Sequence, residues 1–295
     1  EGATIPFISR YRKEITGGLD EVQIGEISDQ LDNYTELSKR KEFILSTIEE
    51  QGKLTLELKQ RITDSWDSTE IEDIYLPYKP KRVTKAEIAR KRGLEPLAKI
   101  VMAQHDDNLV RTAQRFITDE VPSTDDALQG ARDIIAEWVN ENEDARNIVR
   151  TSFVRTAVIT SKVIKGKEEE GSKYQDYFDF NEPLAKCSSH RMLALRRGEN
   201  EGFLRVSISP DTDLCYDRLE RRFVHGSNES SEEVKTAVND SFKRLLKPSI
   251  ETEFASQSKE KADEEAIRVF AENLRQLLLA PPLGQKRVLG IDPGF

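Results

Sequence analysis

A basic segment between positions 79 and 92 has the composition of a surface that binds phosphate. The segment reads KPKRVTKAEIARKR and contains one acidic residue, Glu87. Lys and Arg side chains neutralise the phosphates of a nucleic acid, and such contacts supply affinity without reading base sequence. The alternative is a solvated basic face that binds nothing or contacts acidic protein surfaces. The candidate phosphate ligands are Lys79, Lys81, Arg82, Lys85, Arg90, Lys91 and Arg92.

Arginines form a second candidate group in the segment HRMLALRR, residues 190–197. Arg191, Arg196 and Arg197 are candidates to line a groove that binds nucleic acid. The chain also contains 54 acidic residues, and arginines often pair with neighbouring carboxylates instead. Both interpretations of these three side chains stay open.

The overall charge limits how a nucleic acid can be bound. The formal net charge is −9, so the mean field of the chain does not attract a polyanion, and binding has to use local basic patches. Two cysteines in 295 residues indicate a reducing compartment without a disulfide framework. No apolar run approaches the ~20 residues of a membrane-spanning helix. We therefore expect a cytoplasmic protein with no membrane contact.

Metal and cofactor chemistry finds little support in the sequence. Cys187 and His190 are three positions apart, but Cys215 and His225 are ten apart and form no paired zinc knuckle. A structural role for these four residues is favoured. Neither a glycine-rich phosphate loop nor a Ser-His-Asp pattern stands out. We expect no cofactor, no metal ion and no catalytic residue.

Helices must position the basic segment, because apolar residues recur every three or four positions before it. Pro77 and Pro80 then predict an extended linker that leads into the segment. A terminal strand is predicted by the apolar run that precedes Asp292. The expected helices before the linker span residues 20–51, 55–66 and 69–75.

A helix-turn-helix-like module is predicted across the basic segment. Thr84 and Glu87 have the spacing of a capping box, Gly93 ends the helix, and Pro96 fits the first turn of the next one. That second helix, LEPLAKIV (94–101), is mostly apolar, whereas a recognition helix needs polar side chains to read base edges. We expect contact with the phosphate backbone rather than base-specific reading.

The remainder of the chain predicts a mainly α, elongated multi-helix assembly with a minor β element. Capping signals stand at Ser123 and Ser230. Residues 203–208 alternate apolar and polar side chains, which predicts a strand after a turn-like segment at 196–202. A solvated loop is predicted for 166–173, and further helices for about 143–164 and 250–279.

Five separated blocks of sequence, in the same order, resemble the bacterial Tex family of transcription accessory proteins. Together they extend over essentially the whole chain, which makes the resemblance specific. The blocks are IPFISRYRKEITGGLDEVQ (5–23), EEQGKLT (49–55), EDIYLPYKPKRVTKAEIARKRGLEPLA (72–98), SHRMLALRRGENEGFL (189–204) and VLGIDPGF (288–295).

The resemblance implies an architecture. Tex proteins have a helical N-terminal region with a helix-turn-helix-like module, then an RNase H-like domain of the resolvase type, helix-hairpin-helix modules and an OB-fold RNA-binding domain. This chain would be a fragment that contains the N-terminal part. The implied divisions are N-terminal helices at 1–53, the basic module at 54–104, a central helical region at 105–285, and the first RNase H-like strand at 286–295.

The resemblance also implies a function for the chain. RNase H-like nucleases hold metal ions with several carboxylates, and Asp292 supplies only one of them, so we expect no catalysis by this chain. The main hypothesis is a helical scaffold of a nucleic-acid-binding transcription accessory protein, with RNA or DNA bound at local basic patches. One alternative is a scaffold that docks on RNA polymerase or the ribosome. Another is part of a metal-dependent nuclease.

Overall fold

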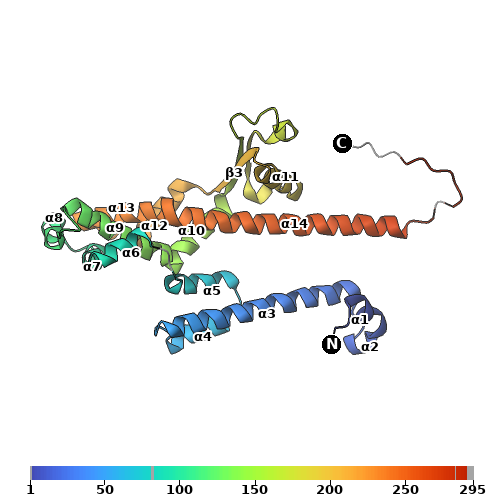
Figure 1. Ribbon diagram of the computed structural model, residues 1–295, viewed down its shortest axis with the longest axis horizontal. Coiled ribbons are helices and arrows are strands. Elements are labelled where there is room, and N and C mark those ends of the chain that lie inside the picture. Colours follow the sequence, from blue (N-terminus) through green and yellow to red (C-terminus); the bar gives the residue numbers. More distant parts are fainter. Residues whose placement is uncertain (1, 81–82, 283, 291–295) are drawn as a thin grey trace.

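The computed structural model describes residues 2–80, 83–282 and 284–290, and it is mainly helical (Figure 1). Two long helices, α3 (Glu21–Glu50) and α14 (Lys247–Leu279), run along the long axis in opposite chain directions. The predicted fold class, mainly α with a small β element, is confirmed. In the part of the chain described, none of the helices combines the length and apolar character needed to cross a membrane.

The first five helices, residues 5–75, form what we call the arm. They are α1 (Ile5–Tyr11), α2 (Lys13–Thr16), α3, α4 (Leu56–Asp64) and α5 (Ser68–Tyr75). Asp20 and Gln23 form a reciprocal capping box at the start of α3, and Gly52, at a φ of 66°, follows its end. A small core lies where the second half of α3 meets α4 and α5; its buried members are Ile44, Ile48, Ile62, Ile71, Ile74 and Tyr75.

Residues 84–265 form what we call the body, which contains one larger core. Its central helix, α9 (Thr124–Glu141), packs against α6 (Lys85–Lys91), α7 (Glu95–Ala103) and α13 (Glu229–Ser241). Gly130 lets the α6–α7 turn approach α9, because a Cβ there would lie 2.3 Å from Leu94 Cδ1. The other body helices are α8 (Leu109–Ala113), α10 (Glu143–Thr156), α11 (Ser189–Asn200), α12 (Thr212–Phe223) and the first part of α14, which follows a π-helical turn at Phe242–Leu246.

A three-stranded antiparallel sheet, in the order β2-β1-β3, lies beside α11 and α14. The strands are β1 (Val158–Val163), β2 (Asp179–Pro183) and β3 (Leu204–Ser209). Ile159 of β1 lies opposite Ile208 of β3, and both are fully buried. On the outer edge of β3, the Glu251 carboxylate of α14 accepts a hydrogen bond from Ile208 N at 2.8 Å. The long helix thus covers one edge of the sheet.

Several predicted elements require correction. The helix predicted over 143–164 ends at Thr156, because the β-branched residues that follow enter the centre of the sheet. The predicted turn at 196–202 is helical as far as Asn200. Pro77 lies in a short 3-10 helix, η1 (Leu76–Tyr78), before the chain becomes extended at Lys79.

The predicted terminal strand has no sheet to join in the described residues, and its assignment as the first strand of an RNase H-like domain stays a prediction. Residues 286–290 belong to neither helix nor strand. Val288 and Leu289 are 72% and 85% exposed, and in the described part of the chain no neighbouring strand pairs with them. A strand needs a partner for its backbone groups. Asp292 lies outside the described residues.

A buried ionic cluster joins the arm to the body. Asp73 of α5 accepts hydrogen bonds from Arg146 Nε at 2.6 Å and from Arg150 Nη2 at 2.9 Å, both on α10. Arg150 also contacts the Glu253 carboxylate of α14 at 2.8 Å. The Asp73 side chain is 7% exposed. Asp73, Arg146, Arg150 and Glu253 are called the clamp below, because they tie α5, α10 and α14 together.

Candidate nucleic-acid interface

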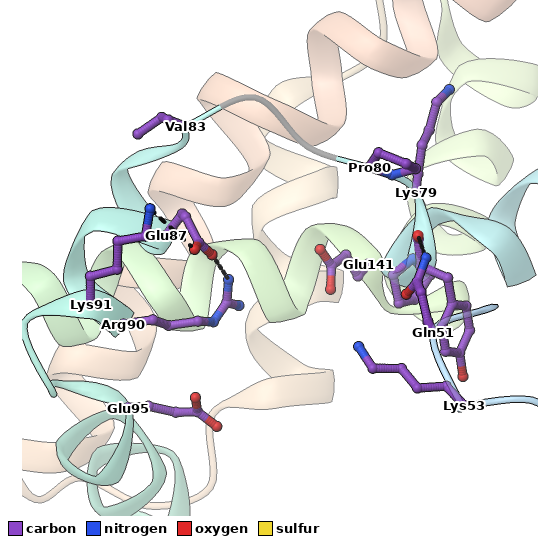
Figure 2. A pocket seen from close by; sticks show the side chains of 12 residues that line it. Gln51, Lys53, Lys79, Pro80, Val83, Glu87, Arg90, Lys91, Glu95 and Glu141 are labelled. Atoms are coloured by element: carbon purple, nitrogen blue, oxygen red, sulfur yellow. Dashed lines mark hydrogen bonds and ion pairs between the residues drawn. The ribbon is translucent and has the colours of Figure 1, made fainter. Parts of the chain in front are cut away.

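The linker before α6 holds Lys79 in solvent. Gln51 Nε2, just beyond the end of α3, donates a hydrogen bond to Tyr78 O at 2.7 Å, which fixes the end of η1. Lys79 then adopts an extended backbone and exposes its side chain. Lys53 lies near it on the same groove (Figure 2). Two lysines that are 26 positions apart in sequence therefore line one groove.

Helix α6 begins as the sequence predicts, but only half of the capping box forms. Thr84 Oγ1 accepts a hydrogen bond from Glu87 N at 3.0 Å and contacts Glu137 Oε1 of α9 at 3.2 Å. The Glu87 carboxylate does not return to the cap. It lies 3.9 Å from Arg90 Nη1 and 3.8 Å from Lys91 Nζ instead. Part of the charge of the basic segment is therefore balanced within its own helix (Figure 2).

Arg90 has a structural partner in the body. Its Nη1 lies 2.5 Å from Oε2 of Glu137, whose side chain is 8% exposed. A buried carboxylate needs such a partner, since an isolated charge in the interior is costly. Arg90 thereby connects α6 to α9, and phosphate has poor access to a guanidinium held this way.

The exposed cations are better placed to meet a polymer. Lys79, Lys85 and Arg92 are exposed and form no ion pair with any described residue. Lys85 and Arg92 are seven positions apart, two turns of α6, so they share one side of the helix. Lys91 is exposed, and its one ion pair with a described residue is the long contact with Glu87. Lys81 and Arg82 lie outside the described residues.

The groove beside these residues, of about 680 Å³, mixes charges of both signs. Figure 2 shows acidic and basic side chains interspersed around it. Such a lining does not favour a compact anion, because each carboxylate opposes binding there. The charged lining residues are Lys53, Lys79, Arg90, Lys91, Glu87, Glu95 and Glu141.

Helix α7 is the second helix of the predicted helix-turn-helix-like module. Leu97, Ala98 and Val101 are buried against the body. Lys99, on the exposed side, pairs with Glu95 at 3.0 Å. The exposed side of α7 therefore offers few polar side chains for base edges, and the module itself stays a prediction.

The three arginines of α11 differ in what they contact. Arg191 Nη2 donates to Glu182 Oε1 at 2.8 Å, and Arg196 Nη1 donates to Glu199 Oε2 at 2.8 Å. Arg197 is exposed and has no ion pair among the described residues. Of this group, Arg197 is the side chain most accessible to a phosphate.

Two further cations, not predicted from the sequence, lie next to each other on the sheet. Lys162 of β1 is directly opposite Arg205 of β3, and both are exposed. Like charges in facing positions destabilise a sheet, and a bound anion relieves that repulsion. Asp179 of β2, on the other side of Lys162, supplies partial compensation. The β-branched residues of 158–163 are a strand signal, but the facing position of Arg205 depends on a distant partner.

The cysteines and histidines do not assemble into a metal site in the described region. Within it, no group of three or more His, Cys, Asp or Glu side chains is arranged to hold a metal ion. Burial raises the pKa of the Cys187 thiol, and it also raises the pKa of the Cys215 thiol. Both thiols are therefore poor nucleophiles at neutral pH.

Comparison with known proteins gives matches along almost the whole chain. Residues 1–49 match the family model described as Tex-like protein N-terminal domain, and residues 105–270 match the model described as Tex central region-like. The chain is 43% identical to the Bacillus subtilis protein YdcI and 41% identical to the Transcriptional accessory protein Tex of Neisseria gonorrhoeae, each over 100% of its length. It is 29% identical to the human S1 RNA-binding domain-containing protein 1 over 99% of its length.

The matches cover only part of these relatives. The chain spans 42% of the Bacillus subtilis protein, 40% of the Neisseria gonorrhoeae protein and 31% of the human protein. The central-region model alone covers more than half of the chain. The chain therefore belongs to the Tex family, of which it comprises the N-terminal and central regions.

Proposed function

We propose that this chain is the helical scaffold of a nucleic-acid-binding transcription accessory protein and contributes a surface that contacts the phosphate backbone. One relative is named for transcription and another for an RNA-binding domain, which supports this class of function. We also propose that the chain performs no catalytic step. Its role is then to position basic side chains relative to the rest of the protein.

One observation carries the proposal. Lys79, Lys85 and Arg92 stay exposed and unpaired among the described residues, in a chain whose net charge is −9. Acidic side chains are abundant, so cations on one segment that avoid them mark a surface available to an external anion. Since α7 offers no base-reading side chains, the contact is expected to be non-specific in sequence.

Reversing the charges of the three exposed cations tests whether this surface binds nucleic acid. The variant Lys79→Glu, Lys85→Glu, Arg92→Glu is expected to bind single-stranded RNA and duplex DNA more weakly, measured by fluorescence anisotropy over a range of salt concentrations. On duplex DNA, the slope of log affinity against log salt should fall by about 0.9 for each phosphate that the variant no longer neutralises. Weakening should be equal for probes of different base sequence.

A matched variant controls for the change in net charge. Lys59, Lys243 and Lys261 are exposed residues on α4, the π-helical turn and α14. Changing all three to Glu alters the net charge of the chain by the same amount, and we expect a smaller decrease in affinity. Equal decreases in the two variants would mean that mean charge, not this surface, controls binding.

Two further assays separate the remaining alternatives. Capture of partners from a lysate before and after nuclease treatment distinguishes binding through nucleic acid from direct docking on RNA polymerase or the ribosome. Retention after nuclease treatment favours direct docking. Incubating nucleic acid with the complete protein and Mg²⁺ or Mn²⁺ tests catalysis, and cleavage that is abolished in Asp292→Asn would contradict a non-catalytic role.

A further inference from the structure

The second half of α14 presents an apolar stripe to solvent. The last contacts of this helix with α11 include the buried Ala262 and Glu265, whose carboxylate accepts a hydrogen bond from Ser189 Oγ. Beyond Glu265, Val269 and Leu279 are exposed on another side of the helix, whereas five further exposed apolar residues share one side at spacings of one, three or four positions. We call them the α14 stripe: Ile267, Phe270, Leu274, Leu277 and Leu278.

The charged residues of the same segment lie elsewhere on the helix. At about 100° per residue, Arg268, Glu272 and Arg275 fall on the other side from the α14 stripe. The stripe is strongly exposed, with Leu277 and Phe270 at 75% and 68%. A contiguous apolar surface of this kind marks an interaction site in a protein of this polarity.

The free end of the arm carries a second apolar surface. We call it the arm tip, formed by α1, α2 and the first half of α3. The rings of Phe7 and Tyr11 lie 5.3 Å apart, and Tyr11 is 71% exposed. Exposed apolar residues also lie on the other side of α3, as at Val22; those assigned to the arm tip are Phe7, Tyr11, Ile15, Ile27 and Leu31.

The two surfaces lie at the same end of the molecule. Figure 1 shows α1, α2 and the C-terminal end of α14 toward the same end of the long axis, because α3 and α14 run in opposite directions. The other ends of these elements are held together by the clamp, in which Asp73 from the arm and Glu253 from α14 share Arg150. The arm and α14 are thus joined at one end and have apolar surfaces at the other.

Charge also favours their association. Residues 21–38 of α3 contain five acidic and no basic side chains. The stripe-bearing segment of α14, residues 266–279, contains Arg268 and Arg275 against Glu272. Opposite net charge on the two segments favours their approach and disfavours pairing of two copies of α3.

We propose that the α14 stripe docks on the arm tip of the same chain, closing the molecule at the end away from the clamp. In the closed form, the apolar side chains of both surfaces leave water, and the clamp serves as the fixed end of the closure. The open arrangement in Figure 1 is then one of two states of the same chain.

Thiol cross-linking tests the proposal in the full 295-residue chain. Cys187 and Cys215 are replaced by Ala, and cysteines are placed on the two surfaces as Tyr11→Cys with Leu274→Cys. A flexible bismaleimide is expected to join them within one chain. At about 10 μM protein, the effective concentration of ~1 mM within one chain makes this reaction on the order of a hundredfold faster than reaction between chains.

Two control experiments test whether cross-linking depends on the apolar surfaces. The pair Asp29→Cys with Glu272→Cys lies on the charged sides of the same helices and should cross-link far more slowly. Adding Phe270→Ser and Leu277→Ser to the first pair should reduce its rate about tenfold, and circular dichroism verifies that both variants keep their helices. These serine substitutions lie at exposed positions, so the fold should tolerate them.

Each outcome either supports or overturns closure of the molecule. A product of monomer size, formed at a rate independent of protein concentration and absent in the serine variant, supports closure. A dimer whose formation depends on concentration overturns it in favour of a second copy of the chain. Equal rates in the stripe pair and the charged-side pair, or no product in either, also overturn it.

Discussion

Helix α9 of the body buries nine of its 18 residues, whereas the longer α3 of the arm buries four of its 30. The difference follows from what surrounds them. Among the described residues, α6, α7 and α13 pack closely around α9, and α8 and α10 also contact it, while α3 is contacted chiefly by α4, α5 and α1. The body is thus stabilised by its own core. The arm has a small core and depends on polar contacts with the body, chiefly the clamp and the Arg61–Glu143 pair at 2.8 Å.

Each region contains one tryptophan, so the stability of the arm and that of the body can be measured separately. Trp66 lies in the arm with Lys41 Nζ 3.9 Å from its ring centre, and Trp138 lies on α9 against the body core. Variants with Trp138→Phe or Trp66→Phe report on one region at a time. Urea unfolding followed by fluorescence then gives a separate free energy of unfolding for the arm and for the body.

The largest effect is expected at the clamp. Asp73→Ala leaves Arg146 and Arg150 buried without their shared carboxylate, and loss of one partner from a buried ion pair costs about 3–5 kcal/mol. The unfolding transition reported by Trp66 fluorescence should then occur at a much lower urea concentration than the transition reported by Trp138. The neighbouring Glu72→Ala is the control, because its pair with Arg40 is about 40% exposed and worth under about 1 kcal/mol. Equal shifts at both tryptophans would show that arm and body unfold as one unit.

Two glycine substitutions should have opposite signs in the two regions. In the body, Gly130→Ala places a Cβ 2.3 Å from Leu94 Cδ1 and 3.3 Å from Ala89 Cβ, and such overpacking costs about 1–3 kcal/mol. In the arm, Gly25 of α3 has open space where its Cβ would lie. Gly25→Ala should stabilise the helix by up to about 1 kcal/mol. Destabilisation by Gly25→Ala would indicate that another surface already covers this part of α3.

Loss of a helix cap should destabilise the whole body but only the nearby turns of the arm. Ser123→Ala and Asp20→Ala each remove a side chain that accepts from a backbone amide of the first turn, which costs about 1 kcal/mol. In the tightly packed body, Ser123→Ala should shift the whole Trp138 transition. In the arm, Asp20→Ala should increase amide hydrogen exchange in the first turns of α3 and leave the Trp66 transition almost unchanged. A full shift at Trp66 would show that α3 is cooperative from end to end.

The smallest effect concerns pH at the edge of the body. Hydrogen bonds from Thr112 Oγ1 and from Asn108 N, the latter at 2.9 Å, hold the pKa of Asp106 below its ordinary value of 3.8. A lowered pKa in the folded state contributes stability above the ordinary value and loses it as the pH falls through the lowered one. Exchange protection of α8 should therefore fall only in strong acid. Thr112→Val should raise the Asp106 pKa in an NMR titration, whereas Thr236→Val should not.

Local signals explain which elements were predictable. Caps at Thr84 and Ser123 and the breaker Gly93 act within one turn of chain, so the sequence locates α6 and α9 correctly. The strand β1 was missed because its identity depends on distant partners: Ile159 pairs with Glu182 and Ile208, far along the chain. Propensity alone does not separate an apolar helix end from the start of a central strand.

Local signals and distant contacts can also be separated at the candidate interface. Lys85 and Arg92 share a side of α6 for reasons visible in their spacing. Arg90 looks equivalent to them in sequence, yet Glu137, 47 positions later, holds it in the body. Lys53 and Lys79 line one groove because the small arm core folds the chain back. Composition therefore identifies a basic segment, and tertiary contacts select which of its cations remain accessible.

The way in which the first turns of α14 are held has a mechanical consequence. Ile250, Glu251 and Glu253 fix the first turns of this helix in the core, at the sheet edge and in the clamp. A helix of 33 residues is about 50 Å long at 1.5 Å per residue. A rigid rod of that length moves its far end by about 4 Å for each 5° of rotation at its base. Small rearrangements around Glu253 are therefore amplified by leverage at the distal end of α14.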